Sequence, residues 1–207
     1  MNLQPAIATG VNALGLTLND DRLSLLCDFV GLLDKWNKAY NLTAVRDVNQ
    51  MVPMHILDSL AIASLITGAT LLDVGTGPGL PGIPLAIAQP QRQFVLLDSN
   101  IKKTRFVQQA VLELGLPNVQ VMHARVEEYQ PSAPFDTVTA RAFAPLARML
   151  PQVGGHVAAD GCVLAMKSQR ADEELEQAPQ GWRLEETIEL EVPGVLGARC
   201  ALRLVKT

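Results

Sequence analysis

The feature that most constrains the fold is a series of short apolar runs, separated by longer helical stretches, which begins near residue 69. The runs are rich in Val, Leu and Ile, and the segments between them are long enough for crossover helices. Because parallel strands need such crossovers and are buried on both faces, the pattern predicts an α/β protein with a largely parallel sheet. The expected strands are residues 69–74, 93–98, 118–124, 135–142 and 162–167.

The regions on either side of this central pattern differ from it. Residues 1–67 have apolar side chains at helical spacing, and a helix is expected from about Pro53 to Ile66. Residues 183–193 and 198–206 alternate like partly exposed strands around a glycine-containing turn, which predicts an antiparallel hairpin at one edge of the sheet. We therefore divide the chain into a helical extension over 1–67 and a main domain over 68–207.

Composition excludes several classes of protein. Hydrophobic residues make up 48% of the chain and charged residues 18%, which is typical of a folded domain and not of a disordered one. The net charge of −4 argues against indiscriminate nucleic-acid binding, although local basic stretches are compatible with a structured nucleic acid. The cysteines, Cys27, Cys162 and Cys200, are widely separated, so we expect a reduced, cytoplasmic protein with no disulfide scaffold and no metal site. No apolar run has the length of a membrane span, and no signal peptide is recognisable.

Polar residues follow the predicted strands at the edge where open α/β sheets bind ligands. The first strand ends in Asp73 and leads into a glycine-rich turn formed by Gly75, Gly77 and Gly79. Because these residues lack a Cβ, a ligand can approach the backbone closely there. The second strand ends in Asp98, whose carboxylate can accept hydrogen bonds from two neighbouring ligand hydroxyls or, alternatively, cap the next helix.

The glycine turn is compatible with two nucleotide cofactors. Residues 77–82 satisfy the GxGxxG dinucleotide fingerprint, so an NAD(P)-dependent oxidoreductase is one alternative. However, Asp73 stands two residues before the turn, where a carboxylate suits an amine-bearing ligand better than a pyrophosphate. The whole pattern, DxGxGxG with an acidic residue ending the second strand, resembles the class I S-adenosylmethionine-dependent methyltransferases. This resemblance implies that Asp98 binds the cofactor ribose and that Val126 and Glu127 border the adenine.

Longer motifs narrow the resemblance to one family. They read WNKAYNLT at 36–43, HILDS at 55–59 and LDVGTGPGLPGIPL at 72–85, and RVEE at 125–128 and RAFA at 141–144 follow them. Together they are similar to the RsmG family, also called GidB, which comprises bacterial methyltransferases that modify N7 of guanine 527 in 16S ribosomal RNA. A non-catalytic ribosome-assembly factor on the same fold is a further alternative.

The resemblance implies roles for named residues. Cofactor binding is expected from Asp73, Gly75, Gly77, Gly79, Leu80, Asp98, Val126, Glu127 and Arg141. Positioning roles are expected from Asn41 and Arg125, and RNA-binding candidates are Lys38, Lys102 and Lys103. The expected partner is 16S rRNA in a 30S subunit or an assembly intermediate, and the expected enzyme is a monomer.

The chemistry of the expected acceptor simplifies the mechanism. N7 of guanine carries a free lone pair, so no proton has to be removed before it attacks a methyl group. The enzyme therefore needs no general base, and alignment of the reactants can supply about 7–11 kcal/mol of barrier lowering. Arg141 at the strand edge suits either a cofactor carboxylate or an RNA phosphate.

Overall fold

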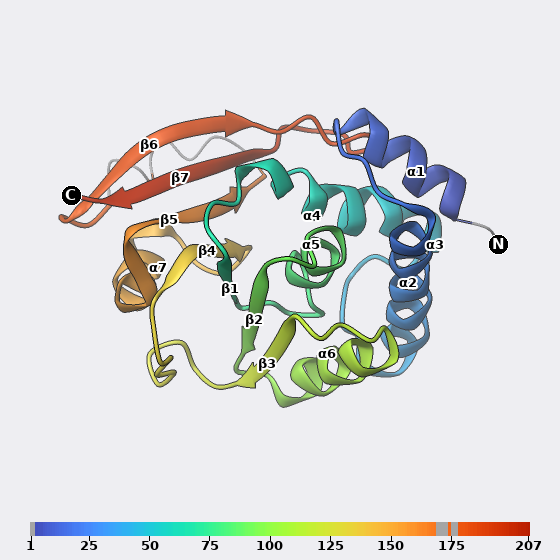
Figure 1. The fold of residues 1–207 in the computed structure, drawn as a ribbon, viewed down its shortest axis with the longest axis horizontal. Coiled ribbons are helices and arrows are strands. Elements are labelled where there is room, and N and C mark those ends of the chain that lie inside the picture. The colour runs from blue at the N-terminus through green and yellow to red at the C-terminus, as the bar shows by residue number, and fades with distance from the viewer. Residues whose placement is uncertain (1–2, 169–173, 175–177) are drawn as a thin grey trace.

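A twisted sheet lies at the centre of the molecule (Figure 1). The computed structural model describes residues 3–168, 174 and 178–207. Within these ranges seven strands form one sheet in the order β3-β2-β1-β4-β5-β7-β6. The strands are β1 (Thr70–Val74), β2 (Gln93–Asp98), β3 (Val119–His123), β4 (Phe135–Arg141), β5 (Val157–Lys167), β6 (Trp182–Glu189) and β7 (Cys200–Lys206).

The strand directions follow the sequence pattern. β1 pairs in parallel with both β2 and β4, and β2 with β3 and β4 with β5 are parallel as well. β7 is antiparallel to both β5 and β6, so the hairpin occupies one edge of the sheet. The predicted parallel sheet with an antiparallel C-terminal hairpin is confirmed. The chain reverses its direction of progress across the sheet between β1 and β4, and ligands bind at such a switch point in open α/β sheets.

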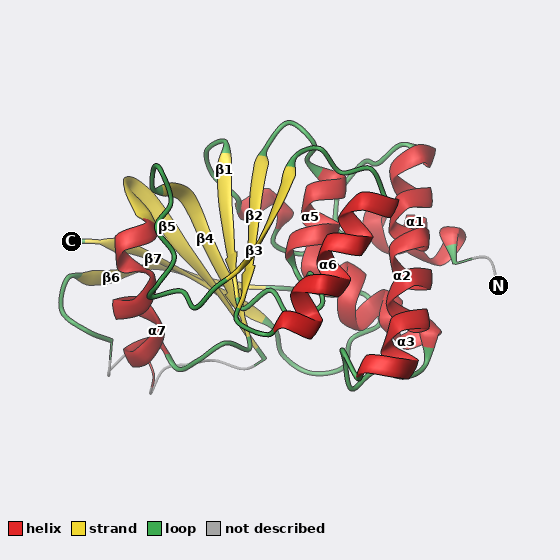
Figure 2. Cartoon of the chain, turned by 90° about the horizontal axis from the view of Figure 1, so that it is seen from below, coloured by secondary structure: helices red, strands yellow, loops and turns green. Residues whose placement is uncertain are grey.

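Helices cover the two faces of the sheet unequally, as Figure 2 shows. One face carries α1 (Gln4–Ala13), α2 (Asp20–Tyr40), α3 (Val48–Met51), α4 (Asp58–Leu60), α5 (Gly82–Ala88) and α6 (Ile101–Glu113). The opposite face carries α7 (Leu146–Val153). Each face has its own apolar core, with Leu71 and Phe94 on the first and Leu72 and Val95 on the second. This alternation follows from the period of two along each strand.

The predicted helix from about Pro53 to Ile66 is not a regular α-helix. The chain forms α3, then a π-helical segment η1 (Val52–Leu57), then α4 and a 3₁₀ turn η2 (Ala63–Leu65). Pro53 stands at the start of η1. Because π-helical turns widen the backbone and are frequent at functional sites, this segment is a second candidate position for a functional site, besides the strand ends.

The helical extension packs on the same apolar core as the first face of the sheet. Ile7 of α1, Leu26 of α2 and Leu85 of α5 belong to that core. The boundary between residues 67 and 68 stays a prediction. None of the helices among the described residues has both the length and the apolar character required to cross a membrane.

Candidate active site

A first cavity of about 340 Å³ lies beyond the carboxyl ends of β1, β2, β3 and β4. Its wall contains Gly75 after β1, Asp98 at the end of β2 and the segment 124–127 after β3. Residues 142–144 after β4, together with Arg148 and Gln152 of α7, complete the wall. The cavity therefore stands at the switch point of the sheet, where the sequence predicts the ligand.

The glycine turn has the open geometry that its sequence predicts. Gly75, Gly77 and Gly79 have positive φ values of 67°, 60° and 84°, a region that other residues adopt only with strain. A Cβ on Gly75 would stand 2.6 Å from Cδ2 of Phe143, which also lines the cavity. Glycine at this position thus allows the turn to pack against Phe143 in the wall of the cavity.

Asp98 holds the turn from the neighbouring strand. One oxygen of its carboxylate, Oδ2, accepts a hydrogen bond from the backbone N–H of Gly77 at 2.9 Å, and Oδ1 accepts from Asn100 N–H at 2.8 Å. The alternative role of Asp98 as a helix cap is taken by Asn100, whose side chain accepts from the first turn of α6. The carboxylate of Asp98 can therefore serve the cavity that it lines.

Asp73 lies beneath the turn and is fully buried. Its Oδ2 accepts hydrogen bonds from the hydroxyl of Thr76 at 2.6 Å and from the backbone N–H of Gly82 at 3.0 Å. Its Oδ1 has no hydrogen-bond partner among the described residues. Burial raises the pKa of Asp73 to about 6, against the opposing effect of these two hydrogen bonds. Asp73 thus fixes the conformation of the turn through its hydrogen bonds with Thr76 and Gly82.

The loop after β3 is fixed from the other side of the cavity. The Nε2–H of His156, which is buried, donates to the carbonyl of Val126 at 2.9 Å. The side-chain amide of Gln152 donates to the carboxylate of Glu127 at 2.5 Å. These contacts fix Val126 and Glu127 in the wall of the cavity that Asp98 also lines.

The residues of this first cavity fit an S-adenosyl nucleoside. A Cβ on Gly75 would collide with Phe143 in the cavity wall, so glycine is required there, and Asp98 presents a carboxylate that suits a ribose diol. Val126 and Glu127 border the cavity where the resemblance places the adenine.

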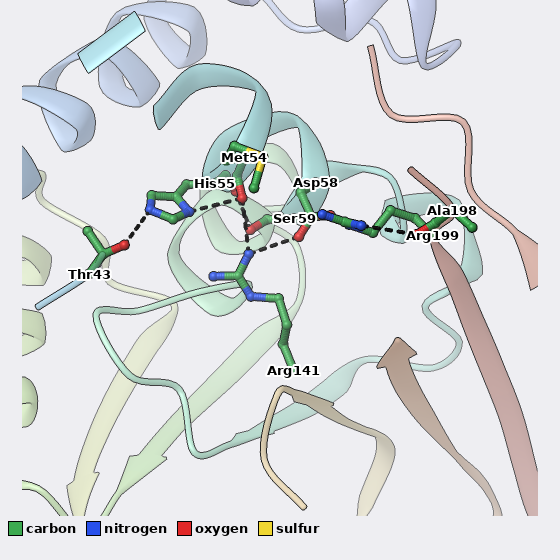
Figure 3. Close-up of polar contacts among 8 residues, drawn as sticks. All are labelled: Thr43, Met54, His55, Asp58, Ser59, Arg141, Ala198 and Arg199. Carbon is green, nitrogen blue, oxygen red and sulfur yellow. Dashed lines mark hydrogen bonds and ion pairs between the residues drawn. The ribbon is translucent and has the colours of Figure 1, made fainter. Parts of the chain in front are cut away.

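A second cavity of about 350 Å³ adjoins the first on the β5 side. Residues from three distant parts of the chain build it (Figure 3). The helical extension contributes Met54, His55 and Asp58, the carboxyl ends of β4 and β5 contribute Arg141, Ala142, Met166, Lys167 and Ser168, and the C-terminal hairpin region contributes Leu190, Arg199 and Cys200.

Asp58 is the centre of the polar groups in the second cavity. Its Oδ2 accepts a hydrogen bond from Nη1 of Arg141 at 2.8 Å, and its Oδ1 accepts from Nε of Arg199 at 3.2 Å. Nη1 of Arg141 also approaches the carbonyl of Met54 at 3.4 Å, as Figure 3 shows. The carboxylate is 8% exposed and each arginine side chain 20%, so all three groups are largely removed from water.

His55 connects this cavity to the loop after α2. Its Nδ1 donates to the Met54 carbonyl at 2.9 Å, because a carbonyl can only accept. Its Nε2 therefore accepts from the hydroxyl of Thr43 at 2.8 Å. Burial and the nearby charge of Arg141 lower the pKa of His55 to about 4, so the imidazole is neutral near pH 7.

Ala142 separates the two cavities and lines both of them. Its φ of 50° lies in the left-handed region, which costs a non-glycine residue about 1 kcal/mol or more. The bend directs its neighbours apart: Arg141 lines the second cavity, and Phe143 lines the first.

The structure brings most of the predicted site residues to this edge of the sheet. Gly75, Asp98, Arg125, Val126, Glu127 and also Lys103 line the first cavity, and Arg141 lines the second. Leu80 is buried. Lys102 is exposed on α6, and the exposed Lys38 pairs with Asp34 at 2.8 Å.

Asn41 lies apart from these groups, at the end of α2. It has a left-handed conformation, and its side-chain oxygen accepts from Arg46 at 2.7 Å. It thereby shapes the loop that carries Thr43.

Sequence reasoning assigned no role to Asp58, Arg199, Gln152 or His156. Asp58 lies within the quoted HILDS motif, which was the available signal for it. Arg199 lies in a segment that reads only as an alternating strand, and nothing in the sequence places it beside Asp58.

The family model and the curated relatives identify one family, and a solved structure shows the same fold. The family model described as "rRNA small subunit methyltransferase G" (GidB) matches residues 22–202. A curated protein named Ribosomal RNA small subunit methyltransferase G from Marinobacter nauticus is 53% identical over 92% of this chain and 89% of its own length. Its namesake from Shewanella pealeana is 50% identical over 93% of both chains. A solved SAM dependent methyltransferase from Aquifex aeolicus superposes with a TM-score of 0.55 at 18% identity, covering 76% of this chain and 93% of that one.

Proposed function

Because the chain belongs to the GidB family of rRNA small subunit methyltransferases, we propose that it transfers a methyl group from S-adenosylmethionine to N7 of guanine 527 in 16S rRNA. The family resemblance and the class I methyltransferase fold are confirmed. The family match also decides against the NAD(P)-dependent oxidoreductase. The position of the modified atom rests on the resemblance of the motifs.

The observation that carries this proposal is the first cavity, in which the glycine turn and the Asp98 carboxylate face Val126 and Glu127. A ribose diol has two donors that a fixed carboxylate accepts, and the Gly75 backbone permits close approach. S-adenosylmethionine, when bound, supplies an electrophilic methyl group. The residues of this chain hold the nucleoside through Asp98 and orient the adenine through the loop at Val126, which His156 fixes.

The acceptor nitrogen needs no general base from the protein. N7 of guanine has a free lone pair, and the contribution of the chain is to place this atom in line with the methyl group. The properties of His55 agree with a reaction that needs no general base. Its low pKa keeps the imidazole neutral, and both of its ring nitrogens are engaged in hydrogen bonds. We assign His55 a structural role beside the acceptor and no proton transfer.

N7 lies in the deep major groove of A-form RNA, out of the reach of side chains. We therefore propose an acceptor in a loop or bulge of 16S rRNA, within a 30S subunit or an assembly intermediate. The setting is the cytoplasm, where the ribosome is built, and the enzyme is proposed to act as a monomer. The net charge of −4 supports recognition of a preformed RNA shape over extensive contact with phosphates.

A binding measurement tests the cofactor assignment. S-adenosylhomocysteine at about 100 times its dissociation constant stabilises a protein by about 2.7 kcal/mol, and the melting temperature of this protein should rise accordingly. NADH under the same conditions should leave the melting temperature unchanged. Stabilisation by NADH and not by S-adenosylhomocysteine contradicts the assignment.

A second experiment tests the reaction and the alternative of a non-catalytic assembly factor. Mass spectrometry of 16S rRNA from a strain lacking this protein should show the loss of one methyl group at one guanine. Expression of the intact protein should restore it, and expression of an Asp98→Asn variant should restore less. An unchanged methylation pattern in the deletion strain refutes the proposed function.

A further inference from the structure

We propose that the second cavity holds the acceptor base and that Arg199, positioned with Arg141 by Asp58, selects guanine by donating hydrogen bonds to O6. This inference rests on the proposed function, because it names the element of the same active site that reads the acceptor. The cavity adjoins the first cavity at Ala142 and opens at the same edge of the sheet. It is thus the neighbouring space from which an acceptor can reach a methyl group held in the first cavity.

The size and lining of the second cavity suit a purine base. Its volume of about 350 Å³ lies in the range of small-molecule sites, which are mostly apolar with a few convergent polar groups. Met54, Met166 and Leu190 supply apolar surface for the faces of a ring. This apolar wall favours a base over a phosphate group as the occupant.

The polar groups distinguish guanine from adenine. At position 6 guanine carries an acceptor oxygen, whereas adenine carries a donor amino group. A guanidinium has only donors, five of them, so it bonds to guanine O6 and opposes adenine N6. Both Arg141 and Arg199 line the cavity, and each has more donors than its contacts with Asp58 and the backbone occupy.

The other polar residues of the cavity are less suited to this role. The two ring nitrogens of His55 are engaged by Thr43 and by the Met54 carbonyl. Lys167 is paired with Glu174 at 2.6 Å. Arg141 precedes Ala142, which lines both cavities, and its charge also acts on Asp73 beneath the glycine turn. Arg199 is therefore the better residue for a test confined to the acceptor.

Asp58 is a positioning residue in this scheme. Each of its oxygens binds one arginine, which sets the two guanidinium groups in a fixed relation. The cluster keeps one net positive charge, because one carboxylate faces two arginines. Such a pair is ordered before the RNA arrives, so little side-chain entropy is lost when the base binds.

The test compares two acceptors that differ at O6. Full-length 16S rRNA is prepared by ligation with either guanine or 2-aminopurine at the acceptor position and is then assembled into 30S subunits. The analogue 2-aminopurine keeps N7 and lacks O6. Wild-type protein should methylate the guanine RNA with a kcat/KM roughly 10- to 100-fold higher, the range for a charged hydrogen bond to a base. Arg199→Ala should lose this preference by lowering kcat/KM for guanine alone. Arg199→Lys should recover it in part.

Controls separate this role from a structural one. Arg183→Ala removes the same charge from an exposed position on β6, with its side chain 57% exposed, and should keep the preference for guanine. The dissociation constant of S-adenosylhomocysteine should be the same for wild type and Arg199→Ala. Wild-type protein that binds S-adenosylhomocysteine but methylates neither RNA refutes the proposed function and with it the inference. Active wild type with equal rates on both RNAs, or an Arg199→Ala variant that slows both equally, overturns the inference alone.

Discussion

Replacing Asp73 by Asn gives a stability change whose dependence on pH follows from the structure. The carboxyl group is fully buried, and its pKa is raised from 3.8 to about 6 in the folded protein. A tenfold change in an ionisation constant corresponds to about 1.4 kcal/mol, so this difference is worth about 3 kcal/mol. Because the folded-state pKa is the higher one, the contribution of Asp73 to folding is most favourable below pH 3.8, and this amount is lost as pH rises through about 6.

The Asn variant does not ionise at this position, so it does not show this decrease in stability as pH rises through about 6. Its side-chain oxygen can still accept from Thr76 and Gly82, as Oδ2 of Asp73 does. The free energy of unfolding of the variant, relative to wild type, should therefore rise by about 3 kcal/mol between about pH 3 and pH 8. The remaining carboxylates titrate alike in both proteins, so they cancel in this difference.

Urea titrations at several pH values, followed by the fluorescence of Trp36 and Trp182, measure the effect. Asp136→Asn is a matched control. Burial alone would raise the pKa of Asp136, but hydrogen bonds from Ala69 and Thr70 outweigh it and lower the pKa. Its titration lies at lower pH, so its difference from wild type should stay constant above about pH 4. A difference for Asp73→Asn that is constant, or that falls with rising pH, refutes the reasoning.

Four further substitutions test the two cavities. Arg141→Ala should reduce methylation steeply while the protein stays folded, because Arg199 still pairs with Asp58; initial rates and melting curves check this. Gly75→Ala should cost about 1–2 kcal/mol of stability and weaken S-adenosylhomocysteine binding, since φ is 67° and the Cβ would meet Phe143; calorimetry that shows unchanged affinity contradicts it. Asp98→Asn should raise the dissociation constant of S-adenosylhomocysteine roughly tenfold through loss of a charged acceptor. Thr43→Val should cost about 1–2 kcal/mol in urea titrations, because it leaves the buried Nε2 of His55 without a donor.

The central sheet was predictable because each strand carries its own signal. Runs such as residues 94–97 are apolar without interruption, and a sheet covered on both faces buries them. The irregular helix near Pro53 was not predictable, since the spacing of apolar residues over so short a segment does not distinguish a π-helical turn from an α-helix. The cap of α6 was likewise not predictable: the sequence suggests Asp98 as an alternative cap, whereas in the structure Asn100 caps the helix and Asp98 accepts from the N–H of Gly77.

The first cavity was largely predictable and the second was not. Gly75, Asp98 and Val126 follow neighbouring strands, so the sequence alone assembles them at one edge. The second cavity depends on Arg199, which the sequence pattern shows only as part of a strand, and on the left-handed Ala142. Neither an ion pair between distant segments nor a positive φ at alanine can be predicted from the local sequence.

The pairing of Asp58 with Arg199 joins positions 141 residues apart. During translation, a growing polypeptide that has emerged through β4 already contains the glycine turn and Asp98, whereas Arg199 is still to be synthesised. The residues proposed to hold the nucleoside are thus synthesised before the residue proposed to select the base. A truncated product that ends before residue 199 therefore contains the glycine turn and Asp98 but lacks Arg199.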